Sequence, residues 1–251
     1  VGDPITKKYP NYSEIVNGAR LRRIFTDLDN KNIKKVIFTS TCSNYGLIAE
    51  NETAEEDHEL NPLSLYAKEK VNAESFIIKN SNLFDYESII LRFSTAFGCA
   101  PRMRFDLSVN EFVRDVYQEK TLEIYDADTW RPYCHVRDFG ELVLKVIQSN
   151  NVYKGEVFNA GSEKNNATKR MITEMIRKYL PKAKLKYVEG GFDKRNYKVN
   201  FKKVREHFDF EAKWDIEAGI KEIIMNLQKG MYQDSGKNKN EYGNYFLEGK
   251  D

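Results

Sequence analysis

The sequence predicts an α/β fold, in which a parallel β-sheet carries helices on its faces. From residue 12 to residue 93, helical patterns alternate with short apolar runs. Apolar residues recur at helical spacing from Tyr12 to Leu28 and again over about 63–80. Val36–Phe38 and Ser88–Phe93 are short apolar runs of the kind that forms buried strands. Helices and strands that alternate along the chain are typical of parallel sheets.

The segment after Gly98 predicts a smaller mixed region beside this sheet. Its pattern follows no simple alternation of helix and strand. We expect helices near 107–118, 137–149, 168–180 and 215–229, and strands near 121–125, 156–159 and 185–188. The polar stretch that follows Gly230 predicts a loose tail.

The composition is that of an ordinary globular protein. At 251 residues the chain can bury a core as one large domain or two small ones. Its net charge of +2 gives no electrostatic argument for a nucleic-acid partner. The sequence shows neither an apolar run of membrane-spanning length nor a signal-peptide pattern. We therefore expect a cytoplasmic protein with no nucleic-acid or membrane partner.

Cysteine and histidine are too sparse for a disulfide framework or a zinc site. The three residues of each type are scattered along the chain: Cys42, Cys99 and Cys134, and His58, His135 and His207. Metal ligands and disulfide partners usually show characteristic spacings, which are not found here. The sequence predicts a protein without a metal.

Tyr66 and Lys70 form the first candidate catalytic pair. Four residues make about one helical turn, so both side chains lie on one face of the expected helix. A lysine ammonium beside a tyrosine favours the phenolate and lowers the pKa of the phenol from about 10. Such a tyrosine can exchange a proton with an alcohol near neutral pH. The alternative is a solvated helix face, because this spacing is common by chance.

Thr41 strengthens this interpretation because it follows an apolar strand, 25 residues before Tyr66. Parallel sheets place their active sites at the carboxyl ends of strands, and the next helix can bring both hydroxyls to one point. Thr41 would then hydrogen-bond to the substrate oxygen. The alternative is that residues 39–41 form a polar turn that caps the next segment.

A glycine-rich turn for a dinucleotide is absent from the sequence. Such a sheet normally opens with a strand, a glycine-rich turn and a helix that holds the pyrophosphate. The fourteen glycines form neither G-x-G-x-x-G nor G-x-x-G-x-x-G. We expect the chain to begin at the end of a middle strand, with the first strands of the domain missing.

Three motifs agree in order and spacing with a known family. These are Val36–Gly46 (Val-Ile-Phe-Thr-Ser-Thr-Cys-Ser-Asn-Tyr-Gly), Tyr66-x-x-x-Lys70 and Leu91–Gly98 (Leu-Arg-Phe-Ser-Thr-Ala-Phe-Gly). The chain resembles the extended short-chain dehydrogenase/reductase family, in its sugar-nucleotide epimerase/dehydratase branch. The resemblance runs from about Asn17 to Gly230. It implies a Rossmann-like parallel sheet, NAD as cofactor with NADP as the alternative, a nucleoside-diphosphate sugar as substrate, and a possible homodimer.

The resemblance also implies three parts of the chain. Residues 1–98 would be a partial dinucleotide-binding domain. Residues 99–230 would be mainly a substrate-binding region, some segments of which return to the sheet. Residues 231–251 would be the polar tail.

The resemblance implies roles for individual residues. Tyr66 would be the acid/base, Lys70 would tune it and bind the nicotinamide ribose, and Thr41 would orient the sugar hydroxyl. Asn17 falls where the family places an asparagine near the cofactor. Phe93 would lie beside the nicotinamide.

Several residues would bind the substrate. Thr95 would lie beside the sugar, and Arg131 and Arg195 would bind its diphosphate, since guanidinium groups pair well with phosphate oxygens. The alternative is a surface residue, which an arginine taken alone more often is. The segment 101–110 resembles a subgroup that acts on nucleotide-linked hexoses and heptoses of bacterial surface polysaccharides. There Asn110, with Arg102 and Arg104, would face the nucleotide-sugar. The alternative for the two arginines, which are two residues apart, is that both are solvated.

One departure from the family is informative. The 4,6-dehydratases of this branch carry an Asp-Glu pair directly after the catalytic threonine, where this chain has Cys42 and Ser43. Neither residue can serve as a carboxylate in water elimination, which argues against dehydration. Cys42 is expected to be a small packed thiol rather than a nucleophile.

These features predict hydride transfer at a sugar carbon, with C4 as the expected position. Epimerase, dehydrogenase and keto-reductase activities would share the same catalytic residues and stay open. The alternative is a non-catalytic dinucleotide-sensing or scaffold protein that kept the fold, but the intact trio of Thr41, Tyr66 and Lys70 argues against it.

Overall fold

The structure is a computed structural model that describes residues 2–49, 51–191, 193–232 and 242–243. The start of the chain at Val1 and most of the expected tail after residue 230 lie outside these ranges. Helix α1 (Asp3–Lys8) begins two residues after Val1, where the end of a strand was expected. Pro4 occupies the first turn of α1. Backbone N–H groups in this turn have no partner within the helix, so the missing N–H of proline costs no helical hydrogen bond.

The secondary structure alternates as expected in the first half and is mixed in the second. The helices after α1 are α2 (Pro10–Glu14), α3 (Leu21–Asp27), α4 (Leu65–Asn80), α5 (Ser108–Tyr117), α6 (Val136–Gln148), α7 (Lys169–Tyr179), α8 (Lys202–Phe208) and α9 (Ile216–Gln228). The strands are β1 (Lys35–Thr41), β2 (Glu87–Phe93), β3 (Thr95–Phe97), β4 (Thr121–Tyr125), β5 (Trp130–His135), β6 (Lys154–Ala160), β7 (Asn166–Thr168) and β8 (Lys184–Val188). Short η segments are η1 (Ile15–Arg20), η2 (Cys42–Tyr45) and η3 (Glu163–Asn165).

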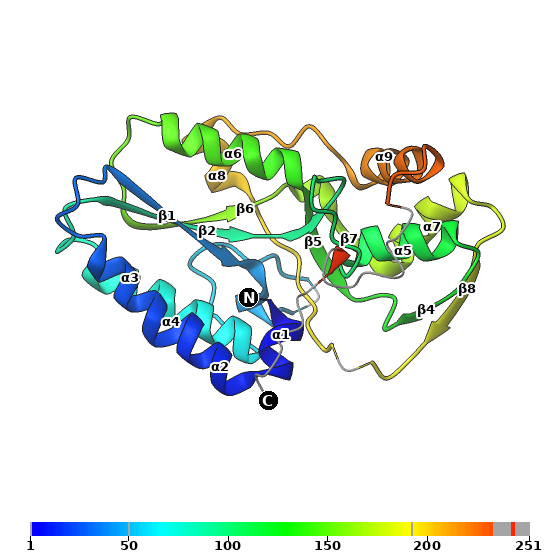
Figure 1. The fold of residues 1–251 in the computed structure, drawn as a ribbon, viewed down its shortest axis with the longest axis horizontal. Coiled ribbons are helices and arrows are strands. Elements are labelled where there is room, and N and C mark those ends of the chain that lie inside the picture. Colours follow the sequence, from blue (N-terminus) through cyan, green and yellow to red (C-terminus); the bar gives the residue numbers. More distant parts are fainter. Residues whose placement is uncertain (1, 50, 192, 233–241, 244–251) are drawn as a thin grey trace.

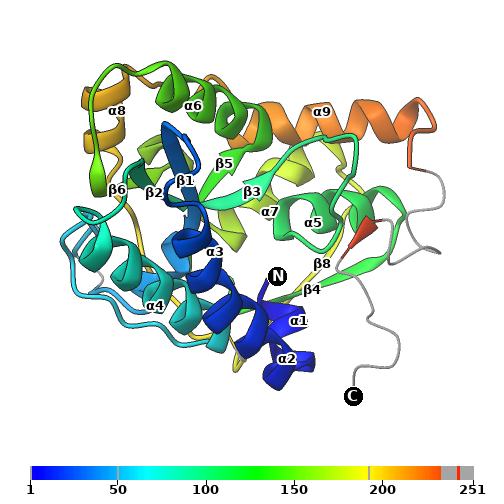
Figure 2. The ribbon, with the colours of Figure 1, turned by 60° about the vertical axis from the view of Figure 1, so that its left-hand side comes forward.

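The central sheet has the order β1-β2-β6, and its described strands are all parallel. Helices α3 and α4 cover one face, and α6 and α8 cover the other (Figures 1 and 2). The predicted α/β fold with a parallel sheet is confirmed. Strand β6 lies within 99–230 and returns to the sheet beside β2, although the proposed division of the chain into parts stays a prediction.

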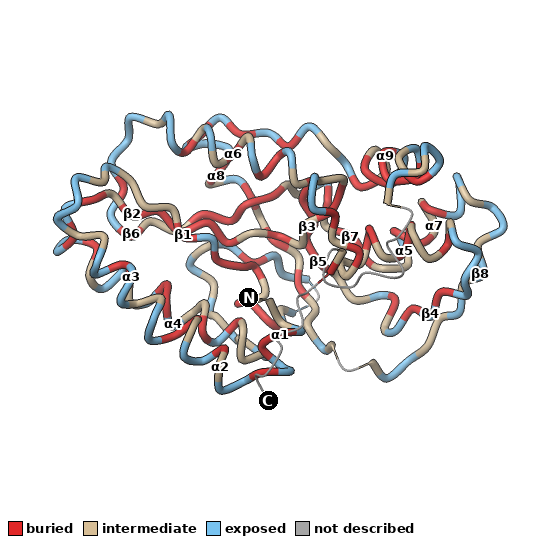
Figure 3. Tube along the Cα trace, viewed as in Figure 1, coloured by how far each residue is buried: buried red, intermediate tan, exposed pale blue. Residues whose placement is uncertain are grey.

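The carboxyl ends of the strands are aligned, which positions the site. Thr41 at the end of β1 pairs with Phe93 at the end of β2, and Phe93 pairs with Ala160 at the end of β6. Figure 3 shows the strands of this sheet largely buried between the helices, while the outer faces of α3 and α4 are exposed. The buried strands leave their polar ends as the part of the sheet that can meet a ligand.

The second half contains two smaller sheets, β3-β5-β7 and β4-β8, packed with α5, α7 and α9. They lie at one end of the central sheet (Figure 1). Strands β3, β5 and β7 and helices α1 and α8 were not predicted. Strands β3 and β7 have only three residues each, and β5 mixes Arg131 and Pro132 with aromatic residues, so none of them forms an apolar run.

The helix predicted over Tyr12–Leu28 is interrupted by a π-helical turn, η1. This turn buries Asn17 and Gly18 against α4. A Cβ atom on Gly18 would lie 2.7 Å from Oε2 of Glu69, so glycine permits the close approach of the two helices. Single π-helical turns of this kind often occur at functional sites.

Within the described ranges, the structure has no helix with the length and apolar character needed to cross a membrane.

Candidate active site

Thr41, Tyr66 and Lys70 surround one cavity of about 540 Å³. Thr41 comes from the end of β1, and the other two come from successive turns of α4. The cavity is lined by Gly2, Ile5, Thr39, Ser40, Thr41, Tyr66, Lys70, Phe93, Ser94, Ala96, Arg102, Arg104, Phe139 and Gly243. The structure therefore brings together the residues that the sequence predicted as a trio.

The start of α4 determines where Tyr66 lies. Ser64 is the N-cap, and its Oγ accepts a hydrogen bond of 3.2 Å from the backbone N–H of Ala67. The same hydroxyl donates to Oδ1 of Asp3 at 2.6 Å, which ties α1 to the start of α4. This cap places Tyr66 in the first turn of the helix, at the edge of the cavity.

Thr41 fits both interpretations offered by the sequence. Its Oγ1 accepts a hydrogen bond of 3.1 Å from the backbone N–H of Ser43 and so caps the short segment η2. Thr41 also lines the cavity, with 8% of its surface exposed. Because the hydroxyl oxygen is used as an acceptor, its proton can be donated to an oxygen in the cavity.

Lys70 lines the cavity and is held by two contacts with β1. Its Nζ donates a hydrogen bond of 2.7 Å to the carbonyl oxygen of Thr39 and lies 4.6 Å from the centre of the Phe38 ring. Burial lowers the pKa of Lys70 to about 8, while the negative charge of Glu74 opposes this shift. The ammonium lies 5.7 Å from the centre of the Tyr66 ring.

Burial, and after it the carboxylate of Asp3, raise the pKa of Tyr66 to about 12. The positive charges of Arg104 and Arg195 oppose this shift without cancelling it. The expectation that Lys70 lowers the pKa of Tyr66 below 10 is therefore wrong for this arrangement. The free energy lost by removing the phenolate from water is larger than the stabilisation that the nearby positive charges provide.

Asp3→Asn should lower the pKa of Tyr66 from about 12. The substitution removes a negative charge that disfavours the phenolate, and it leaves Arg195 with one carboxylate partner fewer. The pKa can be measured from the pH dependence of the ¹³Cζ tyrosine resonance, assigned with Tyr66→Phe. Asp128→Asn, at an exposed ion pair with Arg170, is the control and should leave this titration unchanged. An equal shift in both variants would show that Asp3 has no specific influence.

Asn17 and Phe93, the other two predicted cofactor contacts, lie on η1 and at the end of β2. Asn17 is buried on η1, and its Nδ2 has no hydrogen-bond partner among the described residues. Phe93 lines the cavity and stacks on Phe139, with ring centres 4.3 Å apart. An unpartnered buried amide is unfavourable unless a ligand or water satisfies it, so Asn17 marks a place where a polar ligand group would fit.

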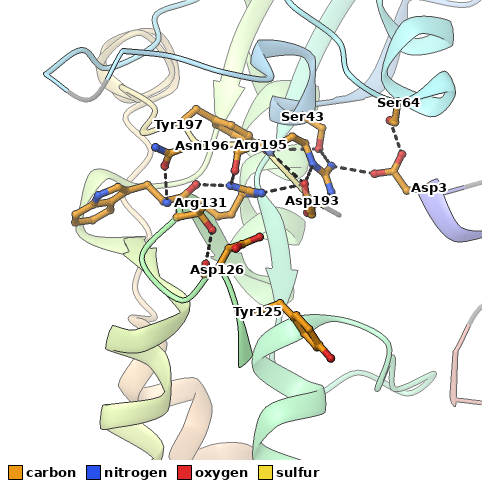
Figure 4. A network of polar contacts seen from close by, with 12 residues as sticks. Asp3, Ser43, Ser64, Tyr125, Asp126, Arg131, Asp193, Arg195, Asn196 and Tyr197 are labelled. Atoms are coloured by element: carbon orange, nitrogen blue, oxygen red, sulfur yellow. Dashed lines mark hydrogen bonds and ion pairs between the residues drawn. The ribbon is translucent and has the colours of Figure 1, made fainter. Parts of the chain in front are cut away.

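Arg131 and Arg195 converge on one carboxylate, that of Asp193 (Figure 4). Arg195 binds Asp193 with both Nε and Nη2 at 2.7 Å, and Nη2 of Arg131 lies 3.1 Å from Oδ1 of Asp193. Nη1 of Arg195 donates to Asp3 at 2.9 Å and to Oγ of Ser43 at 3.0 Å. The two guanidinium groups hold the pKa of Asp193 well below its usual range, against the effect of burial.

Arg131 is itself fixed from several sides. Its Nη1 donates to the carbonyl oxygens of Trp130 (2.7 Å) and Arg195, and its guanidinium lies 5.3 Å from the centre of the Tyr197 ring. Only 6% of Arg131 is exposed. It is therefore not a solvated surface arginine, the alternative that the sequence left open.

A second cavity of about 660 Å³ adjoins the first, since Tyr66 lines both. It is lined by Asp3, Thr6, Lys7, Pro10, Leu63, Ser64, Leu65, Tyr66, Asp193, Lys194 and Arg195. Tyr66 thus lies between the cavity that the trio surrounds and the cavity that Asp193 and Arg195 line.

Three of the predicted substrate residues, Thr95, Asn110 and Arg131, do not line these cavities. Asn110 is 1% exposed, and its amide bonds to the backbone of Gly98 (3.0 Å) and Arg104 (2.9 Å). It holds the loop that carries Arg104, so the expectation that Asn110 faces the nucleotide-sugar is corrected. Thr95 lies between Ser94 and Ala96, which do line the first cavity.

Arg102 and Arg104 line the first cavity, and their predicted contact with a nucleotide-sugar stays a prediction. Arg104 also binds Asp106 with Nε and Nη2, each at 2.6 Å. Both arginines therefore bring positive charge to the cavity.

Cys42 is the small packed thiol that the sequence predicted. It is 1% exposed, and its Sγ donates to the carbonyl oxygen of Arg92 at 3.0 Å. Burial raises the pKa of this thiol to about 12, so it is not a nucleophile.

Sequence reasoning missed Asp193, Asp3 and the contact role of Ser43. The spacing of Asp193 and Arg195, two residues apart, is a weak signal for their pairing. Asp3 and Ser43 carry no local signal, because their partner Arg195 lies far along the chain.

The chain has a parallel sheet with a hydroxyl residue at one strand end, and a tyrosine and a lysine one turn apart on the next helix. This is the arrangement that the resemblance to the short-chain dehydrogenase/reductase class implies. The chain belongs to the NAD dependent epimerase/dehydratase family, whose model matches residues 2–161. The fold is that of the Rossmann-type UDP-sugar epimerases.

Similar proteins share this family. An uncharacterized protein of Methanocaldococcus jannaschii, MJ1055, is 29% identical over 88% of this chain, and a UDP-glucuronate 4-epimerase of Thermodesulfobacterium geofontis is 28% identical over 84%. The chain spans 61% and 64% of the length of these relatives.

Solved structures show the same fold. A dTDP-glucose 4,6-dehydratase of Bacillus anthracis in complex with NAD is 26% identical, with a TM-score of 0.75 over 86% of this chain and 68% of its own. A UDP-glucose 4-epimerase of Thermotoga maritima with UDP-glucose is 20% identical, with a TM-score of 0.80 over 92% of this chain and 75% of its own.

Proposed function

We propose that the protein, in its full length, transfers hydride between NAD(P) and a sugar carbon, C4, of a nucleoside-diphosphate sugar. The observation that carries this proposal is the convergence of Thr41, Tyr66 and Lys70 on one cavity. A non-catalytic protein has no need of these three groups around a shared space. Epimerase, dehydrogenase and keto-reductase activities all use the same groups.

The residues present fit a nicotinamide dinucleotide. Asn17 offers a buried amide nitrogen without a partner among the described residues, and Lys70 offers an ammonium that lines the cavity. Phe93 offers an aromatic face at the same cavity. When bound in its oxidised form, the nicotinamide would accept hydride and add a positive charge that favours the phenolate of Tyr66. NAD is proposed, and NADP is the alternative.

Tyr66 would exchange a proton with the sugar hydroxyl, and Thr41 would orient that hydroxyl. Oη of Tyr66 would take this proton when the sugar is oxidised and return it when the sugar is reduced. Oγ1 of Thr41 would donate a hydrogen bond to the same sugar oxygen. Because burial raises the pKa of Tyr66 to about 12, its phenol form is favoured, and the positive charges of Arg104 and Arg195 reduce the cost of forming the phenolate.

Arg131 and Arg195 would bind the substrate diphosphate. Their guanidinium groups already bind one carboxylate, that of Asp193, by charge-assisted contacts. A diphosphate at this place would compete with Asp193 for the same donors.

Asp193→Asn should therefore increase the affinity for UDP, by roughly tenfold for the loss of one charge-assisted contact. Isothermal titration calorimetry with UDP at fixed ionic strength measures this effect. Asp126→Asn is the matched control, because its carboxylate accepts from the backbone of Gly190 and lies outside the two arginine contacts. Weaker binding by the Asp193 variant would mean that Asp193 orients the arginines rather than competing with the ligand.

The experiment that tests the function uses the full-length protein with NAD or NADP and a panel of nucleoside-diphosphate sugars. Reduction of the cofactor, followed by its absorbance, would identify a dehydrogenase. An unchanged trace with an isomerised sugar would identify an epimerase. Cofactor binding with neither turnover nor isomerisation across the panel would contradict the proposal and favour the scaffold alternative.

A further inference from the structure

A buried ion pair lies beside the catalytic trio. Glu74 on α4 and Arg92 on β2 are 1% and 4% exposed. Arg92 binds Glu74 through Nε at 3.1 and 3.2 Å and through Nη2 at 2.8 Å. Neither residue lines the cavities described above, so neither belongs to the substrate or cofactor contacts.

The Glu74 carboxylate joins α4 to the carboxyl ends of β1 and β2. It accepts a hydrogen bond from Ser40, which precedes Thr41 on β1. It also accepts one of 2.7 Å from Nδ2 of Asn44, which lies in η2 directly after the strand. Its ion-pair partner Arg92 precedes Phe93 at the end of β2.

Glu74 also shares a helix face with the catalytic pair. Tyr66, Lys70 and Glu74 follow one another at intervals of four residues, about one helical turn each. A single carboxylate thus connects the face of α4 that carries Tyr66 and Lys70 to the strand ends that carry Thr41 and Phe93.

The network extends to the third strand of the sheet. Nη1 of Arg92 donates to Oη of Tyr45 at 2.9 Å and to the carbonyl oxygen of Glu56 at 3.0 Å. Tyr45 in turn donates to Oδ1 of Asn159 on β6 at 2.7 Å. The carboxyl ends of β1, β2 and β6 are therefore held together by one set of buried polar contacts.

Stability alone is a weak explanation for such a pair. Apolar side chains of similar volume in place of a buried ion pair often leave stability unchanged or increase it. A geometric role is better supported by these contacts. We propose that Glu74 is a positioning residue, which holds α4 against the ends of β1 and β2 and so fixes Tyr66 and Lys70 relative to Thr41.

The electrostatics agree with this geometry. The carboxylate of Glu74 opposes the lowering of the Lys70 pKa that burial causes, and so favours the ammonium that Lys70 would present. Further charged or titratable groups near Lys70 are Tyr66 and Glu69 on the same helix, Arg92 across the ion pair, and Arg102 and Arg104, which line the same cavity.

Two single variants of the full-length protein separate position from charge. Glu74→Gln removes a negative charge near Lys70 and should lower its pKa, whereas Arg92→Met leaves that negative charge unpaired and should raise it. The ¹³Cε lysine resonance, assigned with Lys70→Met, reports both shifts without cofactor or substrate. If Glu74 acts through position, both variants should lower kcat, by up to about 100-fold, with little change in KM.

If kcat falls in Glu74→Gln but is unchanged in Arg92→Met, activity depends on the charge of Lys70 and not on its position. That result would overturn the proposal. Glu69→Gln is the matched control. It removes a buried carboxylate from the same helix, one residue from Lys70. The Glu69 carboxylate accepts a hydrogen bond from Asn72 and makes no ion pair with Arg92. It should leave both kcat and the Lys70 titration close to the values of the unchanged protein.

A double variant, Glu74→Met with Arg92→Met, tests the proposal if the single variants fail to fold. It leaves no buried charge unpaired, so it should fold. Hydrogen exchange should be at least about tenfold faster at the backbone amides of 39–45 and 64–72 than in the unchanged protein. Unchanged exchange in these segments would overturn the proposal. This readout needs no turnover, so it is separate from the proposed function on which the catalytic meaning of the inference rests.

Discussion

Tyr66→Phe should lower the rate of hydride transfer by about two to four orders of magnitude, the usual contribution of a positioned acid/base group. Phenylalanine keeps the ring and loses only Oη, which would take up or return the proton of the sugar hydroxyl. Thr41 can orient this hydroxyl, but its own ordinary alcohol is a poor base. Substrate affinity should change little, because the diphosphate would be bound elsewhere, by Arg131 and Arg195.

The measurement is single-turnover cofactor absorbance with the full-length protein and the sugar that the panel identifies. Tyr125→Phe is the matched control, since Tyr125 is exposed on β4 and bonds to Glu123 outside both cavities. It should retain full activity. If Tyr66→Phe kept more than about a tenth of the rate, a different group would have to move the proton.

The trio could be predicted from the sequence because the relations between its members depend on short stretches of the chain. The spacing of Tyr66 and Lys70 is fixed by one turn of α4, and Thr41 follows directly from the apolar strand before it. The parallel register then aligns the end of β1 with that of β2. These relations depend only on helix periodicity and on the geometry of a parallel sheet.

The electrostatics of the site could not be predicted in the same way. The pKa of Tyr66 depends first on burial and then on Asp3, which reaches Tyr66 only through the packing of α1. The same limit applies to Glu74. Its spacing from Lys70 suggests an exposed helical charge pair, whereas the fold buries it against Arg92.

The substrate residues show the same contrast between local and distant contacts. Arg131 lies in a strand without an apolar run, and its burial is possible because Asp193 pairs with its charge. Asn110 looked suited to a ligand, but its amide is used by the backbone of Gly98 and Arg104. A polar side chain in a distinctive motif can serve the chain itself as readily as a ligand.

Gly46→Ala should lower the free energy of unfolding by roughly 2–5 kcal/mol, from backbone strain and overpacking together. Gly46 ends η2 with φ 66° and ψ −90°, a conformation that residues with a Cβ rarely adopt. A Cβ there would lie 1.9 Å from the carbonyl oxygen of Asn61. Because this neighbour is backbone, it cannot rotate away, and relief would require the loop before α4 to move.

Gly190→Ala separates the two causes. Gly190 also has a positive φ, 83°, but a Cβ there would meet nothing within 4 Å. Strain alone predicts a loss of roughly 1–2 kcal/mol in this control. Urea unfolding followed by circular dichroism measures both variants. Equal losses of unfolding free energy would mean that the contact with Asn61 is relieved at little cost. The loop leading into α4 would then deform more easily than its packing indicates. A larger loss in Gly46→Ala would show that this loop resists movement, as the placement of Tyr66 at the start of α4 requires.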